Sequence, residues 1–148
     1  MFSPKKILVP SDFSESSDNA LKEAVDIAEK FGSSIVLLHV ISSDMVQCAD
    51  HYCLSADLMQ QIEEDSIRAS RQRLEKAVNA IIASRGIEIV FDIQRGVPSE
   101  TILAEQKRVG ADLIVIASHG RTGLKKLLLG SVAEKVVRNA ECQVMVVK

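Results

Sequence analysis

Short apolar runs and amphipathic segments alternate along the whole chain. The apolar runs predict buried strands at residues 7–10, 35–40, 87–93, 112–117 and 143–147. Segments with helical spacing of apolar residues lie between them, at about residues 14–31, 57–85, 98–109 and 131–139. Strands that alternate with helices are typical of a parallel sheet with helices on both faces. The pattern therefore predicts an open doubly wound α/β fold with a five-stranded parallel sheet.

Capping residues and helical spacing predict the ends and the buried faces of the helices. Ser14 offers a side-chain oxygen to the first turn of the first helix, and Gly32 follows its last turn. Spacing places Phe31 on the core-facing side of this helix. It also places Ile67 beside Leu74 on the core-facing side of the long second helix. We therefore expect these apolar side chains to be buried.

The pattern also distinguishes an edge strand and a long loop. Residues 87–93 alternate only partly between apolar and polar positions, which suggests a half-exposed edge strand. Residues 42–56 are polar and mixed without a clear period, and they predict a loop. No repeat, linker or low-complexity segment divides the chain, so we expect a single domain over residues 1–148.

Composition and charge narrow the classes of protein that the chain can represent. With 148 residues, 47% of them hydrophobic and 26% charged, the chain is long and apolar enough for one full core. The formal net charge is -2 and the signs are interleaved, which argues against a nucleic-acid binder with a basic stripe. No apolar run approaches the roughly 20 residues of a membrane span, and no signal-peptide core follows the first lysines. We expect a cytoplasmic protein without a nucleic-acid or membrane partner.

The cysteines do not predict a metal site. Cys48 and Cys53 flank His51 in the polar loop, but they lack the tight Cys-x2-Cys spacing of structural zinc sites. Two free thiols are the simpler interpretation. Cys142 lies in the last predicted strand, where a small buried hydrophobe is expected.

Polar residues and glycines gather at the ends of two predicted strands. In open parallel sheets, ligands bind beyond the carboxyl ends of the strands, where the strand order reverses. The first strand ends in Pro10, Ser11 and Asp12, and the fourth runs from Ala117 through residues 118–120, which read Ser-His-Gly. If these two strands are neighbours, their ends define one pocket.

The segment after the fourth strand is a candidate for binding phosphate. Gly120, Gly123 and Gly130 can take positive φ or let the backbone approach a ligand closely. The first N–H groups of the following helix are unpaired and lie at the positive end of its dipole, and the Ser131 hydroxyl can add a hydrogen bond. Ser131 and Glu134 can instead form a capping box that needs no ligand. The segment matches neither the Walker loop nor the dinucleotide fingerprint, so both interpretations stay open.

Other polar residues at these strand ends also have two interpretations. Asp12 can accept hydrogen bonds from ribose hydroxyls, help to hold magnesium, or cap the first helix. His39 is expected to be a satisfied core residue, whereas the backbone beside it at Val40 could pair with an adenine edge. His119 beside Ser118 is a weak basis for nucleophilic catalysis without a positioned acid.

Taken in order, these segments resemble the universal stress protein family from end to end. The residues that carry the resemblance are 7–14, 37–40, 96–98 with Ile102, 111–116 with 118–120, 129–132 and 142–147. The resemblance implies an adenine-nucleotide-binding fold, similar to the adenine-nucleotide α-hydrolases, with strand order 3-2-1-4-5. This order makes the first and fourth strands neighbours, in agreement with the pocket inferred above.

The resemblance also implies an ATP site with one departure from the family pattern. ATP-binding members carry Gly, two residues, Gly, nine residues, Gly and then Ser or Thr. Gly120, Gly130 and Ser131 match the later positions, but Ala117 replaces the first glycine. Alanine adds only one methyl group, which the end of a strand tolerates if φ is negative. We therefore expect the pocket to persist with weaker affinity.

Carried over by position, the family's site predicts a complete set of binding residues. The expected nucleotide-binding residues are Pro10, Ser11, Asp12 and Val40 toward the adenosine, and Gly120, Gly130, Ser131 and Val132 at the phosphates. Three residues of the same segment, Ala117, His119 and Arg121, complete the expected set, and Arg121 could attract phosphate. The implied cofactor is ATP with Mg²⁺, and no catalytic residue is assigned. Family members commonly form homodimers by pairing the last strand, here Gln143–Val147.

Three functions follow from these features. The leading hypothesis is an ATP-binding stress-response module in which the nucleotide sets conformation or the choice of partner. A nucleotide-free dimeric interaction protein is the alternative if Ala117 has closed the pocket. A slow magnesium-dependent ATP hydrolase that uses His119 is the third.

Overall fold

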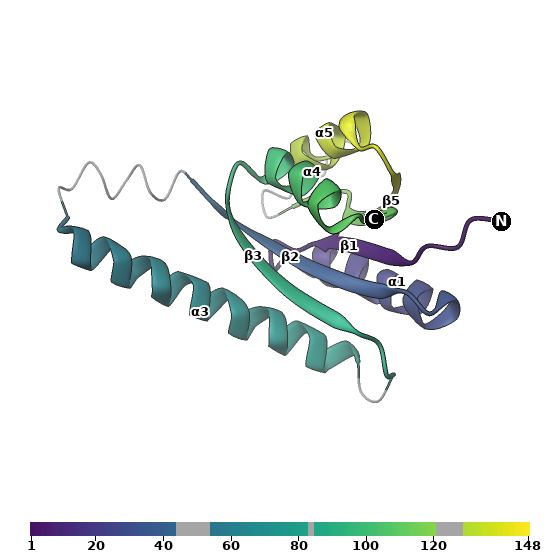
Figure 1. Ribbon diagram of the computed structural model, residues 1–148, viewed down its shortest axis with the longest axis horizontal. Coiled ribbons are helices and arrows are strands. Elements are labelled where there is room, and N and C mark those ends of the chain that lie inside the picture. Colours follow the sequence, from purple (N-terminus) through teal and green to yellow (C-terminus); the bar gives the residue numbers. More distant parts are fainter. Residues whose placement is uncertain (44–53, 83–84, 121–128) are drawn as a thin grey trace.

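The computed structural model describes residues 1–43, 54–82, 85–120 and 129–148. In chain order the elements are β1 (Lys6–Pro10), α1 (Glu15–Phe31), β2 (Ser34–Ser42), α3 (Ala56–Ile81), β3 (Ile89–Gly96), α4 (Pro98–Val109), β4 (Leu113–Ala117), α5 (Ser131–Asn139) and β5 (Gln143–Val147) (Figure 1). The five strands form one parallel sheet in the order β3-β2-β1-β4-β5. The predicted α/β class and strand order are confirmed.

Helices cover both faces of the sheet, and β1 lies at its centre. Ile7 and Val9 belong to the core beneath α1 and α3, whereas Leu8 belongs to the core beneath α4 and α5. All three side chains are fully buried, because successive strand residues point to opposite faces and each face has a helical layer. Burying one such side chain stabilises the fold by about 1.5–3 kcal/mol.

Helix α1 has the predicted ends but a shorter buried face. The Ser14 hydroxyl accepts a hydrogen bond from the backbone N–H of Ser17, and Gly32 ends the helix in the left-handed conformation with φ of 69°. The prediction that Phe31 is buried is wrong, since it is 36% exposed and the buried face ends at Ala28. Helical spacing fixes the direction of a side chain but not how far the opposing layer extends.

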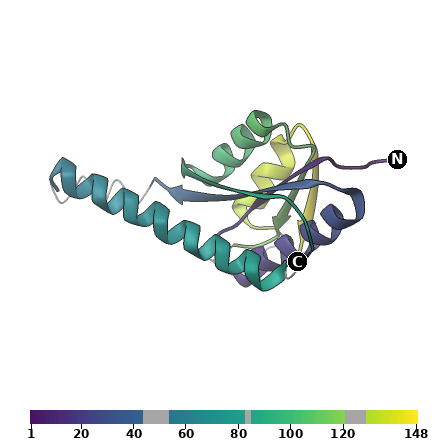
Figure 2. The same ribbon diagram turned by 60° about the horizontal axis from the view of Figure 1, so that its bottom comes forward.

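Helix α3 differs most from its prediction. It ends at Ile81 rather than near residue 85, and residues 83–84 lie outside the described part of the chain. The expectation that Ile67 is buried is wrong because the first half of α3 extends beyond the sheet (Figures 1 and 2). The buried residues of this helix are Ser70 and Leu74, both in its second half.

The strand after α3 begins and ends later than predicted. β3 covers Ile89–Gly96 rather than residues 87–93, because it pairs with β2 along its whole length, from Ile35 opposite Ile89 to Ser42 opposite Gly96. It is an edge strand with Val90 51% exposed, which confirms the half-exposed edge.

Several residues with sequence-based expectations lie outside the described part of the chain or at the end of a strand. The expectations for Cys48, His51, Cys53, Arg121 and Gly123 fall on residues outside the described part. Cys142 lies one residue before β5 rather than inside it, and it is partly rather than fully buried.

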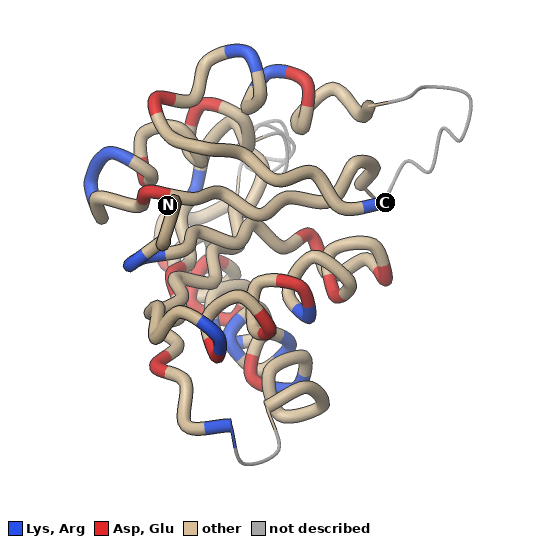
Figure 3. Tube along the Cα trace, turned by 90° about the vertical axis from the view of Figure 1, so that its right-hand side faces the viewer, with Lys and Arg blue, Asp and Glu red and all other residues tan. Residues whose placement is uncertain are grey.

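Basic and acidic residues alternate over the same helices (Figure 3), in agreement with the interleaved sequence. No helix within the described ranges is both long enough and apolar enough to cross a bilayer.

Candidate functional site

The carboxyl ends of β1 and β4 lie side by side and open into a cavity of about 270 Å³. The helix after β1 covers one face of the sheet and the helix after β4 covers the other, so the two chain directions diverge here. The cavity is lined by Pro10, Ser11, Asp12, Ser17, Leu38, Val40, Pro98, Ile102, Ile116, Ala117, Ser118, His119, Gly120, Gly130, Ser131, Val132 and Ala133. Every predicted binding residue that the structure describes is among them, and Arg121 lies outside the described residues.

The loop between β1 and α1 places a carboxylate at the cavity wall. Asp12 Oδ1 accepts a hydrogen bond from the backbone N–H of Ser14 at 3.0 Å and another from the Ser14 hydroxyl. The other oxygen, Oδ2, lies beside Gly120, where a Cβ atom would come within 2.7 Å of it. Gly120 is therefore required for close approach between this loop and the loop after β4.

The segments on either side of residues 121–128 contact each other directly. The Gly130 N–H donates to the carbonyl oxygen of Ser118 at 2.6 Å, and the Ser118 N–H donates to the carbonyl of Val147 at 2.7 Å. A Cβ atom on Gly130 would lie 3.2 Å from the Ser118 oxygen, so close approach favours glycine here as well. Gly130 has φ of -70°, so the left-handed conformation considered for it is not used.

Helix α5 begins with free hydrogen-bonding groups facing the cavity. Gly130 is its N-cap and Ser131 is its first helical residue, without a side-chain cap. The capping box between Ser131 and Glu134 is therefore not formed, and Glu134 instead pairs with Arg138 at 3.0 Å. Because capping does not use its hydroxyl, the exposed Ser131 can offer that group to a ligand.

The two histidines near the cavity have different environments. His39 is buried, and its Nδ1 atom lies 2.8 Å from the carbonyl oxygen of Ser11, which confirms the expectation of a satisfied core residue. His119 lines the cavity, and its Nδ1 atom lies 3.0 Å from the Ser118 hydroxyl. This contact orients the His119 ring within the cavity wall.

One wall of the cavity is apolar and was not predicted. Leu38 and Ile116 contribute from the sheet, and Pro98 and Ile102 contribute from α4. Pro98 and Ile102 are four residues apart and so lie on one face of the helix. The rule that ligands bind at strand ends predicts site residues after β1 and β4. It does not predict residues of α4, because this helix follows the distant edge strand β3 in the chain.

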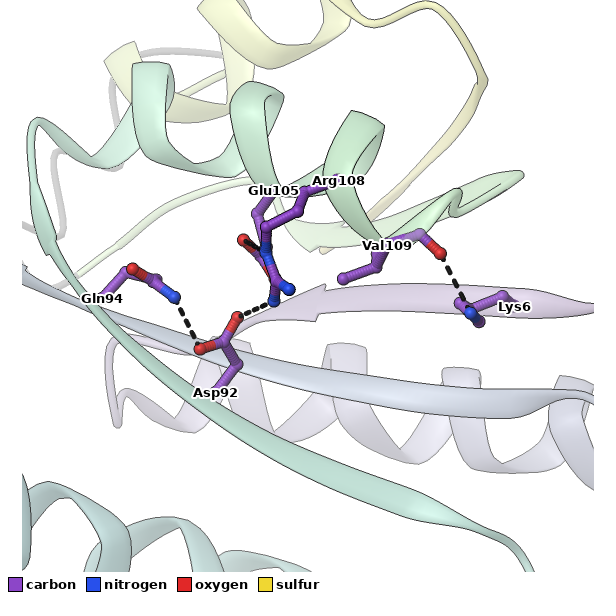
Figure 4. Close-up of polar contacts among 6 residues, drawn as sticks. All are labelled: Lys6, Asp92, Gln94, Glu105, Arg108 and Val109. Atoms are coloured by element: carbon purple, nitrogen blue, oxygen red, sulfur yellow. Dashed lines mark hydrogen bonds and ion pairs between the residues drawn. The ribbon is translucent and has the colours of Figure 1, made fainter.

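A charged cluster fixes α4 to the sheet (Figure 4). Arg108 donates to Glu105 on the same helix and, at 3.2 Å, to Asp92 on β3. Burial raises the pKa of Glu105 above its ordinary value. Burial also opposes ionisation of Asp92, but hydrogen bonds from Glu105 and Gln94 together with Arg108 lower the pKa of Asp92. The cluster holds the helix that supplies the apolar wall.

A second contact fixes the far end of α4. Lys6 Nζ donates to the carbonyl oxygen of Val109 at 2.9 Å, at the last turn of the helix (Figure 4). A positive charge at a helix C-terminus is favourable because it faces the negative end of the dipole. Together the two contacts attach α4 to both β3 and β1.

The side chains of the cavity suit a cation that is also coordinated by a phosphate better than a metal ion coordinated by protein ligands alone. Among the described residues, no group of three or more His, Cys, Asp or Glu side chains could hold a metal ion. Asp12 is the acidic residue among those that line the cavity. Mg²⁺ commonly binds one or two carboxylates together with substrate phosphates, so one carboxylate fits such an ion only when a phosphate accompanies it.

Comparison with known proteins identifies the class that this fold and site define. Residues 4–148 match the model of the universal stress protein family. Universal stress protein MJ0531 of Methanocaldococcus jannaschii is 35% identical over 144 residues, which cover 97% of this chain and 82% of the relative. The chain belongs to the universal stress protein family, as the resemblance predicted.

Solved structures of the family share the fold. The structure of MJ0577, also from M. jannaschii, superimposes with a TM-score of 0.84 at 30% identity, covering 99% of this chain and 97% of the other. A universal stress protein in complex with cAMP gives a TM-score of 0.69 at 22% identity, covering 98% and 97% of the two chains. One from Archaeoglobus fulgidus in complex with dAMP gives 0.67 at 23%, covering 99% and 100%.

Proposed function

We propose that this universal stress protein binds ATP in the cavity between the ends of β1 and β4 and acts as a nucleotide-dependent regulator in the stress response. The observation that carries the proposal is the cavity itself, which gathers Asp12, the start of α5 and an apolar wall around one space. The complexes of proteins with this fold with cAMP and dAMP support an adenine nucleotide as the ligand class.

Each part of the cavity suits one part of the nucleotide. Gly120, Gly130 and the N-terminus of α5 at Ser131 face the phosphates, because backbone N–H groups there attract an anion. Val132 and His119 complete this end of the cavity, and Arg121 belongs to the same predicted set. If Mg²⁺ accompanies the phosphates, Asp12 is the lining carboxylate that would help to hold it and so neutralise part of their charge.

The adenosine occupies the part of the cavity next to the end of β1. Asp12 accepts hydrogen bonds from the ribose hydroxyls, and Pro10, Ser11 and Val40 border the base and the sugar. The apolar surface of Ile102 and its neighbours covers one face of the base. Adenine suits this environment because its rings are apolar while its edge can pair with the backbone at Val40.

The backbone conformation of Ala117, which replaces the first family glycine, is compatible with a site that persists. Ala117 is the last residue of β4, and φ is positive at only one non-glycine residue of the described chain, Phe13. Ala117 therefore has the negative φ that an alanine tolerates. Its side chain lines the cavity without closing it.

The proposal includes a cytoplasmic homodimer formed through β5. This strand is an edge of the sheet and carries apolar residues, of which Met145 is 36% exposed. Pairing with a second copy would satisfy the unpaired backbone groups of the edge and cover these side chains.

Calorimetric titration of nucleotide-stripped protein with Mg-ATP tests the proposed site, with AMP as the comparison. We expect micromolar binding of ATP that weakens when the β- and γ-phosphates are absent. Ser131→Ala should weaken ATP binding by about 1–2 kcal/mol, the scale of one hydrogen bond to a charged group, and should change AMP binding less. A folded protein that binds neither nucleotide would instead favour a nucleotide-free dimeric interaction protein.

A further inference from the structure

Phe13, the residue after Asp12, has an unusual backbone conformation. Its φ is 66°, the only positive value at a non-glycine residue in the described ranges. A bulky aromatic residue rarely adopts the left-handed conformation, so its surroundings must hold it there. Its side chain does not line the cavity and instead packs against the core beneath α1 and α3.

Two side chains from separate elements hold the ring of Phe13. The imidazole of His39 on β2 stacks against it with the ring centroids 4.1 Å apart and an interplanar angle of 33°. The guanidinium of Arg73 on α3 lies 4.0 Å from the ring centroid, which is a cation–π contact. The conformation of the loop is therefore tied to the sheet on one side and to the long helix on the other.

Hydrogen bonds join these ring contacts to the backbone of the same loop. His39 Nδ1 lies 2.8 Å from the Ser11 carbonyl oxygen, and the Phe13 N–H donates to the Ser11 hydroxyl at 3.2 Å. Asp12 lies between Ser11 and Phe13 in the chain, and its carboxylate accepts a hydrogen bond from the N–H of Ser14. If Phe13 changed to a negative φ, the peptide bond leading to Ser14 would rotate and its bond to Asp12 would break.

We propose that Phe13, held by His39 and Arg73, is a positioning residue that fixes the Asp12 carboxylate toward the ribose of the bound nucleotide. The inference rests on the proposed function, since it names the contacts that hold a binding residue of that same site in place. Phe13 acts through Asp12 and does not touch the ligand. Through Arg73, helix α3 becomes part of the support of the site although it contributes no described residue to the cavity wall.

The test compares the dissociation constants of ATP and 2′,3′-dideoxy-ATP, because only the former offers hydroxyls to Asp12. The wild-type protein should prefer ATP about tenfold or more. Arg73→Ala and Phe13→Leu should lower the ratio of the two dissociation constants toward 1. Phe13→Tyr keeps an aromatic face and should leave the ratio close to that of the wild type. Arg71→Ala, which removes another exposed arginine of α3, is the matched control and should leave the ratio unchanged.

Amide chemical shifts of Asp12 and Ser14 in the nucleotide-free protein give a second readout. Arg73→Ala should move them and Arg71→Ala should not. A wild-type preference that survives in both Arg73→Ala and Phe13→Leu would overturn the inference, and so would a wild-type ratio near 1. If the wild-type protein binds no nucleotide, the proposed function fails. Movement of the amide shifts in Arg73→Ala would then still support the inference that the contacts of Phe13 position Asp12, and unchanged shifts would overturn it.

Discussion

At the scale of the residue, the cavity depends on the close approach of two loops as well as on the backbone conformation of Phe13. Asp12 and Gly120 come from different loops, and the carboxylate occupies the space that a side chain at position 120 would need. Ser131 contributes because its hydroxyl is not used for capping. The chemistry of the site thus depends on where small residues leave room for polar atoms.

Gly120→Ala should weaken ATP binding about tenfold, the scale of one hydrogen bond to a charged group. The added Cβ atom would lie 2.7 Å from Asp12 Oδ2, so the carboxylate must move away from its position. Thermal unfolding should change little, because Gly120 is exposed. Titration calorimetry and a melting curve measure the two effects.

A double-mutant cycle shows whether the effect passes through Asp12. If it does, Gly120→Ala combined with Asp12→Ala should bind ATP no more weakly than Asp12→Ala alone. Additive losses would mean that the methyl group obstructs the nucleotide directly.

At the scale of the element, sequence patterns predicted the types and order of helices and strands but not the extent of the layers that cover them. Leu74 is buried as expected and Ile67 is not, although both lie on the same predicted face of one helix. The difference arises because α3 is longer than the sheet beneath it, which no local pattern records. Ile102 carried part of the family resemblance, but its place in the cavity wall was not predicted for a related reason, since only the crossover from β3 brings α4 over the strand ends.

The charged cluster beneath α4 makes stability depend on pH. The pKa of buried Glu105 is raised in the folded protein above its ordinary value of 4.5. The stability that this carboxyl contributes is therefore fully present below pH 4.5 and is lost as pH rises through the raised pKa. Glu105→Gln keeps hydrogen-bonding groups but cannot ionise. The unfolding free energy of the wild type should therefore fall relative to that of the variant as pH rises from 4.5 to neutrality.

Urea unfolding at several pH values between 4.5 and 7.5 measures this difference. Asp92 affects a separate pH window, because its lowered pKa gives it a stabilising contribution that is present above its ordinary pKa of 3.8 and is lost as pH falls below that value. The exposed Glu100 on the same helix provides the matched control, and Glu100→Gln should leave the pH dependence as it is in the wild type. A constant difference between wild type and Glu105→Gln across the range would contradict the assignment.

At the scale of the whole molecule, the strand order places the site. The chain proceeds from β1 outward to β3, then returns to the other side of β1 through α4. This return brings the carboxyl end of β4 beside that of β1 and the N-terminus of α5 into the cavity. The pocket between the first and fourth strands could be predicted once the order was known, and the order came from the family resemblance rather than from hydrophobic pattern.

The overhang of α3 means that one helix spans two regions of different local stability. Residues 56–69 contain no buried side chain, whereas Ser70 and Leu74 are buried and Val78 packs against the core. The surface ion pair between Arg95 and Glu63, at 3.2 Å, adds little to the first half. Amide hydrogens before Ser70 should therefore exchange with solvent through local fraying, and those after it only through larger openings.

Hydrogen exchange followed by mass spectrometry or NMR would resolve the two halves. We expect protection to rise by about tenfold or more between the first and last turns of α3, since each 1.4 kcal/mol of opening free energy is a factor of ten. Uniform protection along the helix would show that its first half is held by contacts that its burial does not reveal. The helix that reaches farthest from the sheet would then open and close as a single cooperative unit.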